Sequence, residues 1–95
     1  MLNHTSRLVM VVDDDESVRC GLKRLLRSAG YDVRTFSDAQ QLLAHGRPPE
    51  PCCLVLDIQM PGISGLEFQH VLAERGIRMP IIFLILAAMG LGNVA

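Results

Sequence analysis

The chain has 95 residues, nine of them Lys or Arg and ten of them Asp or Glu, so its formal net charge at pH 7 is −1. This balance excludes the strongly basic surface of a small nucleic-acid-binding domain. Hydrophobic residues make up 49% of the sequence and aromatic residues only 4%, which favours one small domain with an aliphatic core around a buried parallel sheet.

The first half of the chain alternates between strand and helix patterns. Residues 8–12 are a continuous aliphatic run, typical of a strand that is buried on both faces. Residues 31–36 alternate enough for a strand near the sheet edge, and Ser37 opens a Ser-x-x-Gln capping box before a short helix through residues 42–44. Between the two strands, apolar side chains recur at helical spacing up to a stop at Gly30: Val18, Leu22, Leu25, Leu26 and Ala29.

The second half repeats this alternation. Residues 45–51 hold three prolines and are expected to be a loop, and residues 52–56 form a second aliphatic strand that runs into Asp57. Residues 81–85 read as a third buried strand. Between these strands the sequence predicts a helix with a Ser-x-x-Glu capping box at its start, three inward apolar side chains and a glycine stop: Ser64, Glu67, Phe68, Val71, Leu72 and Gly76.

Alternating strands and helices at this spacing predict an α/β fold, with a parallel sheet and helices on both faces. In such folds, functional groups lie at the carboxyl ends of the strands, at a topological switch point. Asp13 and Asp14 follow the first aliphatic strand, and Asp57 follows the second. If these strands are neighbours, about 5 Å apart, three carboxylates converge and predict a site for a hard dication such as Mg²⁺. For Asp15 and Glu16 we expect only a favourable place at a helix N-terminus.

Asp57 stands at a strand end above a tight loop, in L-D-I-Q-M-P-G-I-S-G. A carboxylate placed in this way can be a metal ligand, a general base or a nucleophile towards phosphorus. Phosphatases of the haloacid dehalogenase type also place an Asp nucleophile there, but they require Asp-x-Asp, and Gln59 occupies that second position. A small Mg²⁺-dependent phosphohydrolase is therefore the least favoured function.

The motifs V-D-D at residues 12–14 and L-D-x-x-M-P-G-x-x-G at residues 56–65 resemble the receiver domain of two-component response regulators. The segments S-G-L-E-F and R-M-P-I-I-F-L are similar to the corresponding segments of regulators with a LuxR-type DNA-binding domain. The resemblance implies a flavodoxin-like, doubly wound parallel sheet with strand order 2-1-3-4. It also implies that Asp57 accepts a phosphoryl group from a sensor-kinase phosphohistidine. Mg²⁺ would be held by Asp13, Asp14, Asp57 and the backbone carbonyl of Gln59.

The resemblance ends after the fourth strand. Receivers end that strand on Thr or Ser, where this chain has Ile85, and they later supply a Lys from a fifth strand. The only lysine is Lys23, which the helical rise places about 12 Å further along the first helix than Asp15. We therefore expect an incomplete receiver over residues 1–86, lacking the fifth strand and last helices, and a tail over residues 87–95 outside the family pattern. A fragment, a frameshifted product and a degraded paralogue remain open.

Two functions stay in view besides the phosphohydrolase: a phosphoacceptor receiver that is impaired by truncation, and a pseudo-receiver that binds without switching. Neither is an enzyme in the usual sense. The expected partners are a sensor histidine kinase and a second copy through the exposed edge of the last strand, without direct nucleic-acid or membrane binding. Three kinds of side chain carry no predicted chemistry: buried reduced cysteines (Cys20, Cys52, Cys53), surface histidines (His4, His45, His70) and a solvated basic stripe (Arg19, Arg24, Arg27).

The compartment follows from the same sequence. The N-terminus has no apolar segment typical of a signal peptide, and the apolar run over residues 81–89 is under half of the roughly 20 residues that cross a bilayer. The cysteines show neither C-x-x-C nor zinc spacing. We therefore expect a cytoplasmic protein.

Overall fold

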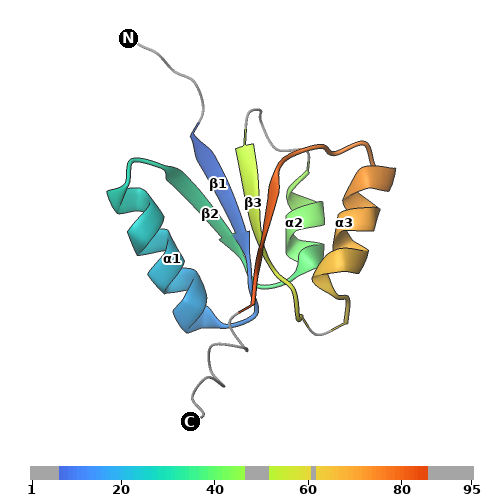
Figure 1. Ribbon diagram of the computed structural model, residues 1–95, viewed down its shortest axis with the longest axis horizontal. Coiled ribbons are helices and arrows are strands. Elements are labelled where there is room, and N and C mark those ends of the chain that lie inside the picture. The colour runs from blue at the N-terminus through green and yellow to red at the C-terminus, as the bar shows by residue number, and fades with distance from the viewer. Residues whose placement is uncertain (1–6, 47–51, 61, 86–95) are drawn as a thin grey trace.

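The computed structural model describes residues 7–46, 52–60 and 62–85 (Figure 1). In this part of the chain, strands and helices alternate as the sequence predicts. The elements in order are β1 (Leu8–Val12), α1 (Glu16–Ser28), β2 (Asp32–Phe36), α2 (Ala39–His45), β3 (Cys52–Asp57), α3 (Gly65–Glu74) and β4 (Ile81–Leu84). The predicted boundary at residue 86 and the tail over 87–95 lie outside the described residues and stay predictions.

The four strands form one parallel sheet in the order β2-β1-β3-β4, which confirms the predicted strand order and the flavodoxin-like fold. The register aligns Val12 of β1 with Phe36 of β2 and with Leu56 of β3. The residues after Val12 and after Leu56 therefore emerge side by side at the carboxyl edge of the sheet. This is the edge where the sequence predicts a site.

Helices cover both faces of the sheet: α1 lies on one side, and α2 and α3 lie on the other (Figure 1). Alternate residues of the central strands divide between two cores because side chains alternate across a strand. The larger core joins β1 and β3 to α2 and α3, with Met10, Leu54 and Phe68 fully buried. The smaller core lies under α1 and includes Val11 and Val55. The two strands that carry the acids are thus the most deeply buried.

Helix α1 is less buried than the sequence predicts. It contributes no fully buried residue, and Leu25, expected on its inward face, is 63% exposed. Leu22 and Leu26 are the α1 residues that pack on the smaller core. Because α1 contacts mainly β2 and β1 at one side of the sheet, its buried face is too narrow to include Leu25. Cys20, predicted to be buried, is also exposed on this helix.

The start of α2 differs from the predicted capping box by one residue. Asp38, not Ser37, is the N-cap, and its side chain accepts a hydrogen bond from the Gln41 N–H. The Ser37 N–H donates to the Gln41 side chain. Asp is as good an N-cap as Ser, and the Asp38 carboxylate takes the capping position because Gln41 stands three residues later. The predicted loop over 45–51 begins later as well, since His45 still belongs to α2.

Strand β4 is only partly buried, whereas residues 81–85 read as a third buried strand; its place at the edge of the sheet is as the sequence predicts. It ends at Leu84, so Ile85 lies outside it, and Ile82 and Ile85 are 54% and 55% exposed. Among the described residues, this strand pairs only with β3, and α1 makes its main strand contacts with β2 and β1. An edge strand with one neighbour leaves part of its side-chain surface in water.

Within the described residues, no helix is both long enough and apolar enough to cross a membrane.

Candidate functional site

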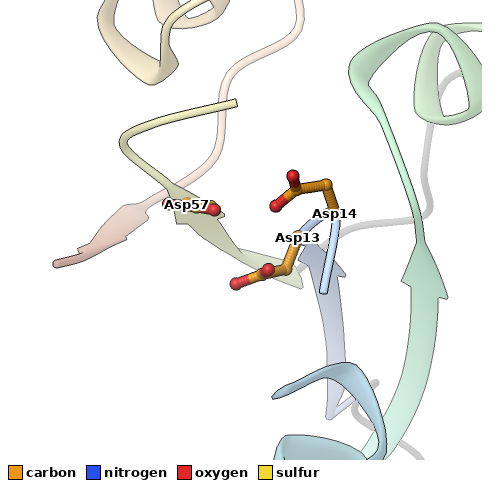
Figure 2. Close-up of side chains that lie close together, drawn as sticks. All are labelled: Asp13, Asp14 and Asp57. Atoms are coloured by element: carbon orange, nitrogen blue, oxygen red, sulfur yellow. The ribbon is translucent and has the colours of Figure 1, made fainter. Parts of the chain in front are cut away.

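Three aspartates meet at the carboxyl edge of the sheet. Asp13 and Asp14 follow β1 directly, and Asp57 is the last residue of the neighbouring strand β3. One carboxylate oxygen from each lies within 4.8 Å of the other two. Figure 2 shows Asp13 and Asp14 at the end of β1 with their carboxylates on the side where Asp57 lies. The structure thus brings together the three carboxylates that the sequence predicts as metal ligands.

Asp13 is the buried member of the cluster, with 2% of its surface exposed. Its N–H donates to the Phe36 carbonyl (3.1 Å), which extends the pairing of β1 with β2 by one residue. Its Oδ1 accepts from the Asp15 N–H (2.9 Å), and its carbonyl accepts from Nη1 of Arg19 (2.7 Å). Three bonds therefore fix the Asp13 backbone and side chain in place before any ligand binds.

Asp57 is held by the loop that follows it. Its Oδ1 accepts a hydrogen bond from the Gln59 N–H (3.0 Å), and the Gly65 N–H at the start of α3 donates to the Ile58 carbonyl (3.0 Å). The two segments pack so closely that a Cβ at Gly65 would lie 2.9 Å from the Asp57 carbonyl oxygen and 3.2 Å from the Phe83 ring. Glycine is therefore required at position 65 if the carboxyl end of β3 is to keep its position against α3.

Two of the three carboxyl groups, those of Asp13 and Asp57, have a raised pKa and so resist ionisation. Burial raises the pKa of Asp13 above its ordinary value of 3.8, the Asp15 N–H offsets this in part, and the charges of Asp57, Asp14 and Asp15 raise it further. Burial also raises the pKa of Asp57; the Gln59 N–H lowers it, while the charge of Asp14 and a hydrogen bond shared with that carboxyl raise it. Protonation of these carboxyl groups, or binding of a cation beside them, is therefore favoured, because either one neutralises negative charge.

The donor set fits Mg²⁺. The three side chains offer only oxygen, the ligand atom of a hard dication. Across residues 7–46, 52–60 and 62–85, no basic side chain forms an ion pair with these carboxylates. A bound dication would offset both the burial and the mutual repulsion that raise the pKa values of Asp13 and Asp57. The backbone carbonyl of Gln59, predicted as a fourth ligand, stays a prediction.

This electrostatic state has a consequence for stability. Because the pKa of Asp57 is raised in the folded chain, the folded state binds this proton more tightly than the unfolded state. The contribution to the free energy of unfolding is fully present below the unfolded pKa of about 3.9 and is lost as pH rises through the folded pKa. Relative to wild type, metal-free Asp57→Asn should therefore gain stability as pH rises, and Mg²⁺ should reverse this difference. Urea unfolding at several pH values, with chelator or with Mg²⁺, measures it; a pH-independent difference would contradict the electrostatic account.

The other predicted residues take supporting or peripheral places. Asp15 is the N-cap of α1 and accepts from the Ser17 and Val18 N–H groups, as expected of a residue that favours the helix start. Lys23 lies on α1 beside Arg19, next to a small polar cavity rather than within the aspartate cluster.

Sequence reasoning missed two contributors to the site. It assigned Arg19 to a solvated stripe, although this side chain bonds the Asp13 carbonyl. It named the glycine at position 65 only as the end of a motif, without recognising its close approach to Asp57. The spacing of Arg19, six residues after Asp13 and in the first helical turn, is the pattern that points to the first contact, because helical side chains lean towards the helix N-terminus.

Comparison with known proteins shows which family this chain resembles in sequence. The model of the response regulator receiver domain matches residues 9–89. Nodulation protein W of Bradyrhizobium diazoefficiens is 45% identical over 80 residues, which make up 84% of this chain and 35% of that protein. Transcriptional regulatory protein FixJ of Azorhizobium caulinodans is 45% identical over 74 residues, 78% of this chain and 35% of that protein. The chain thus spans about a third of the length of these relatives.

Solved structures agree with the sequence relatives. Full-length FixJ from B. japonicum superposes with a TM-score of 0.78 at 33% identity, covering 96% of this chain and 49% of that one. Response regulator protein TrrA from Thermotoga maritima, solved in complex with Mg(2+)-BeF, superposes with a TM-score of 0.74 at 29% identity, covering 93% of this chain and 76% of that one. With the matched family model and the strand order, these likenesses show that the chain belongs to the receiver domains of two-component response regulators.

Proposed function

We propose that Asp57 accepts a phosphoryl group from the phosphohistidine of a sensor histidine kinase, in a Mg²⁺-dependent reaction. The observation that carries this proposal is the convergence of Asp13, Asp14 and Asp57, with one oxygen of each within 4.8 Å of the others. The related protein TrrA was solved with Mg(2+)-BeF, which supports the choice of metal. In this proposal the chain is a phosphoacceptor and does not turn over a free substrate.

Each residue has a distinct part in this reaction. Asp13, Asp14 and Asp57 would hold Mg²⁺ together with the Gln59 carbonyl. When bound there, the metal would supply charge neutralisation on the phosphoryl oxygens and in-line alignment. The Gln59 N–H engages one oxygen of Asp57, and the other oxygen attacks phosphorus. The new O–P bond replaces the N–P bond to the donor imidazole, which leaves with the electron pair and takes up a proton.

A non-switching pseudo-receiver is the second candidate, and Ile85 is the observation that favours it. In the receiver domains that this chain resembles, Thr or Ser stands at this position, and its hydroxyl binds a phosphoryl oxygen. Ile85 follows β4, has no hydroxyl and is 55% exposed. Losing one fixed electrostatic donor typically slows a catalytic site by about 10²–10³. Phosphoryl transfer to Asp57 should therefore be slow, and its effect on β4 small.

Calorimetric titration with Mg²⁺ tests the metal half of the proposal. The wild-type chain should bind one Mg²⁺. Asp13→Ala and Asp14→Ala should each weaken binding by about 100-fold or more, because loss of even an outer-shell partner costs a metal site roughly 10–100-fold. Asp32→Asn, at the opposite end of the neighbouring strand β2, is the matched control and should bind as wild type does. Folded wild-type chain that gives no Mg²⁺-dependent heat would remove the proposed site.

The wider setting is also a proposal. The relatives named as transcriptional regulators support a role in controlling transcription as part of a longer protein, with no nucleic-acid contact by this chain. Among the described residues, Cys20 and Cys53 form no disulfide, which suits the reducing cytoplasm. The exposed edge at Ile82 supports self-association through β4, which sedimentation at two protein concentrations would detect.

A further inference from the structure

Arg19 on α1 donates a hydrogen bond to the Asp13 carbonyl, and helix stability does not explain this bond. The helix begins at Glu16, so Arg19 lies at the end of its first turn. There the positive end of the helix dipole disfavours a cation. Its half-buried side chain nevertheless runs back past the helix start, and Nη1 donates to the Asp13 carbonyl oxygen at 2.7 Å. The contact calls for a reason outside the helix.

The bonded carbonyl belongs to the peptide that joins two proposed metal ligands. A peptide unit is planar, so the Asp13 carbonyl fixes the plane that also contains the N and Cα of Asp14. The Asp13 N–H is already tied to Phe36, and its Oδ1 to the Asp15 N–H. The Asp14 side chain is exposed, and in the described part of the chain Arg19 is the side chain that holds the peptide leading to it.

We infer that Arg19 is a positioning residue of the metal site: its bond to the Asp13 carbonyl orients the Asp13–Asp14 peptide so that both carboxylates face Asp57. The inference rests on the proposed function, because it assigns Arg19 a part in metal binding. Arg19 does not touch the metal or the phosphoryl group in this account. Its effect passes through Asp14, whose place depends on the peptide that Arg19 holds.

The positive charge of Arg19 and its hydrogen bond have opposite effects on Mg²⁺ affinity. The direction in which affinity changes in a variant therefore tests the inference. A guanidinium near the site repels a dication, so loss of charge alone would tighten Mg²⁺ binding. Loss of the hydrogen bond would weaken it. Arg24 is a matched control, since it is exposed on the same helix, and in the described residues no hydrogen bond or ion pair engages its side chain. Arg24→Gln removes the same charge without removing a contact to the acidic loop.

Mg²⁺ affinity and melting temperature should be measured for the full chain and for Arg19→Gln, Arg19→Lys and Arg24→Gln. We expect Arg19→Gln to weaken Mg²⁺ binding by about tenfold, the lower end of the effect of an outer-shell partner. Arg19→Lys, which keeps a charged donor, should restore part of the affinity. Arg24→Gln, which loses charge without losing a contact, should bind Mg²⁺ as tightly as wild type or slightly more tightly. A merely structural contact would lower the melting temperature of Arg19→Gln and leave the affinity of the folded chain unchanged.

The outcomes separate this inference from the proposed function. Wild type that binds Mg²⁺ while Arg19→Gln binds it equally well or more tightly would overturn the positioning role and leave the proposed function standing. Wild type that is folded and binds no Mg²⁺ would overturn both. If Arg19→Gln does not fold, the decision rests on Arg19→Lys. Its affinity should fall below wild type, because the lysine side chain is shorter and does not place its ammonium where Nη1 lies. Equal affinity in Arg19→Lys would then overturn the inference.

Discussion

Asp57→Asn is expected to take up no phosphoryl group from acetyl phosphate in the presence of Mg²⁺. The amide is isosteric with the carboxylate, but it is neutral and far less nucleophilic. It also removes one of the three carboxylates that would hold the metal. The fold should survive, because burial raises the pKa of Asp57 and its charge therefore does not stabilise the folded state. Intact-mass spectrometry over a time course measures the uptake.

The control is Asp32→Asn. Asp32 is exposed at the start of β2, at the opposite end of the sheet, so this variant should be labelled as wild type is. Wild-type labelling itself should be slow, since Ile85 supplies no hydroxyl and the chain has no lysine after Lys23. Labelling of Asp57→Asn at the wild-type rate would show that another group accepts the phosphoryl and would refute the assignment of Asp57.

Gly65→Ala is expected to destabilise the fold and to slow the labelling of Asp57. The new Cβ would lie 2.9 Å from the Asp57 carbonyl oxygen and 3.0 Å from the Ile58 Cα. Both neighbours are backbone atoms, so β3 and α3 have to separate. Overpacking of this kind typically costs about 1–3 kcal/mol, a large share of the stability of so small a domain. The separation also moves the strand end that carries Asp57.

Gly21→Ala is the matched control for this substitution. Gly21 is exposed on α1, and nothing lies within 4 Å of a Cβ built there. Because Ala is the better helix former, Gly21→Ala should raise the free energy of unfolding by about 0.5–1 kcal/mol. Urea denaturation and labelling rates should be compared for both variants. Gly65→Ala with wild-type stability and labelling would mean that the loop relaxes without moving Asp57.

The sequence predicted the acidic site because two strong patterns coincide in it. Residues 8–12 and 52–56 are apolar runs typical of a strand covered on both faces; acids from Asp13 onward follow the first run, and Asp57 follows the second. Parallel strands place their carboxyl ends at one edge, so the convergence of Asp13, Asp14 and Asp57 needs no knowledge of side-chain detail. The strand order, which makes β1 and β3 neighbours, was then available from the family resemblance.

The errors arose where burial depends on tertiary placement. Leu25 fits the helical period but lies beyond the narrow face that α1 presents to the sheet. Ile82 belongs to an aliphatic run that reads as buried, but its side chain is exposed because β4 lies at the sheet edge, as the sequence also predicts. The bond from Arg19 to the Asp13 carbonyl joins a side chain to a backbone oxygen. Residue type alone gives no sign of such a contact, because every backbone carbonyl is an acceptor.

The most direct test of the central claim is to locate the phosphoryl group. The wild-type chain should be incubated with acetyl phosphate, once with Mg²⁺ and once with a chelator, and peptides should then be mapped by mass spectrometry after borohydride trapping of the acyl phosphate. We predict one modified residue, Asp57, in the Mg²⁺ sample, and no modification in the chelated one. Modification of Asp13 or Asp14 instead, or equal modification of Asp57 without Mg²⁺, would contradict a metal-dependent phosphoacceptor at the end of β3.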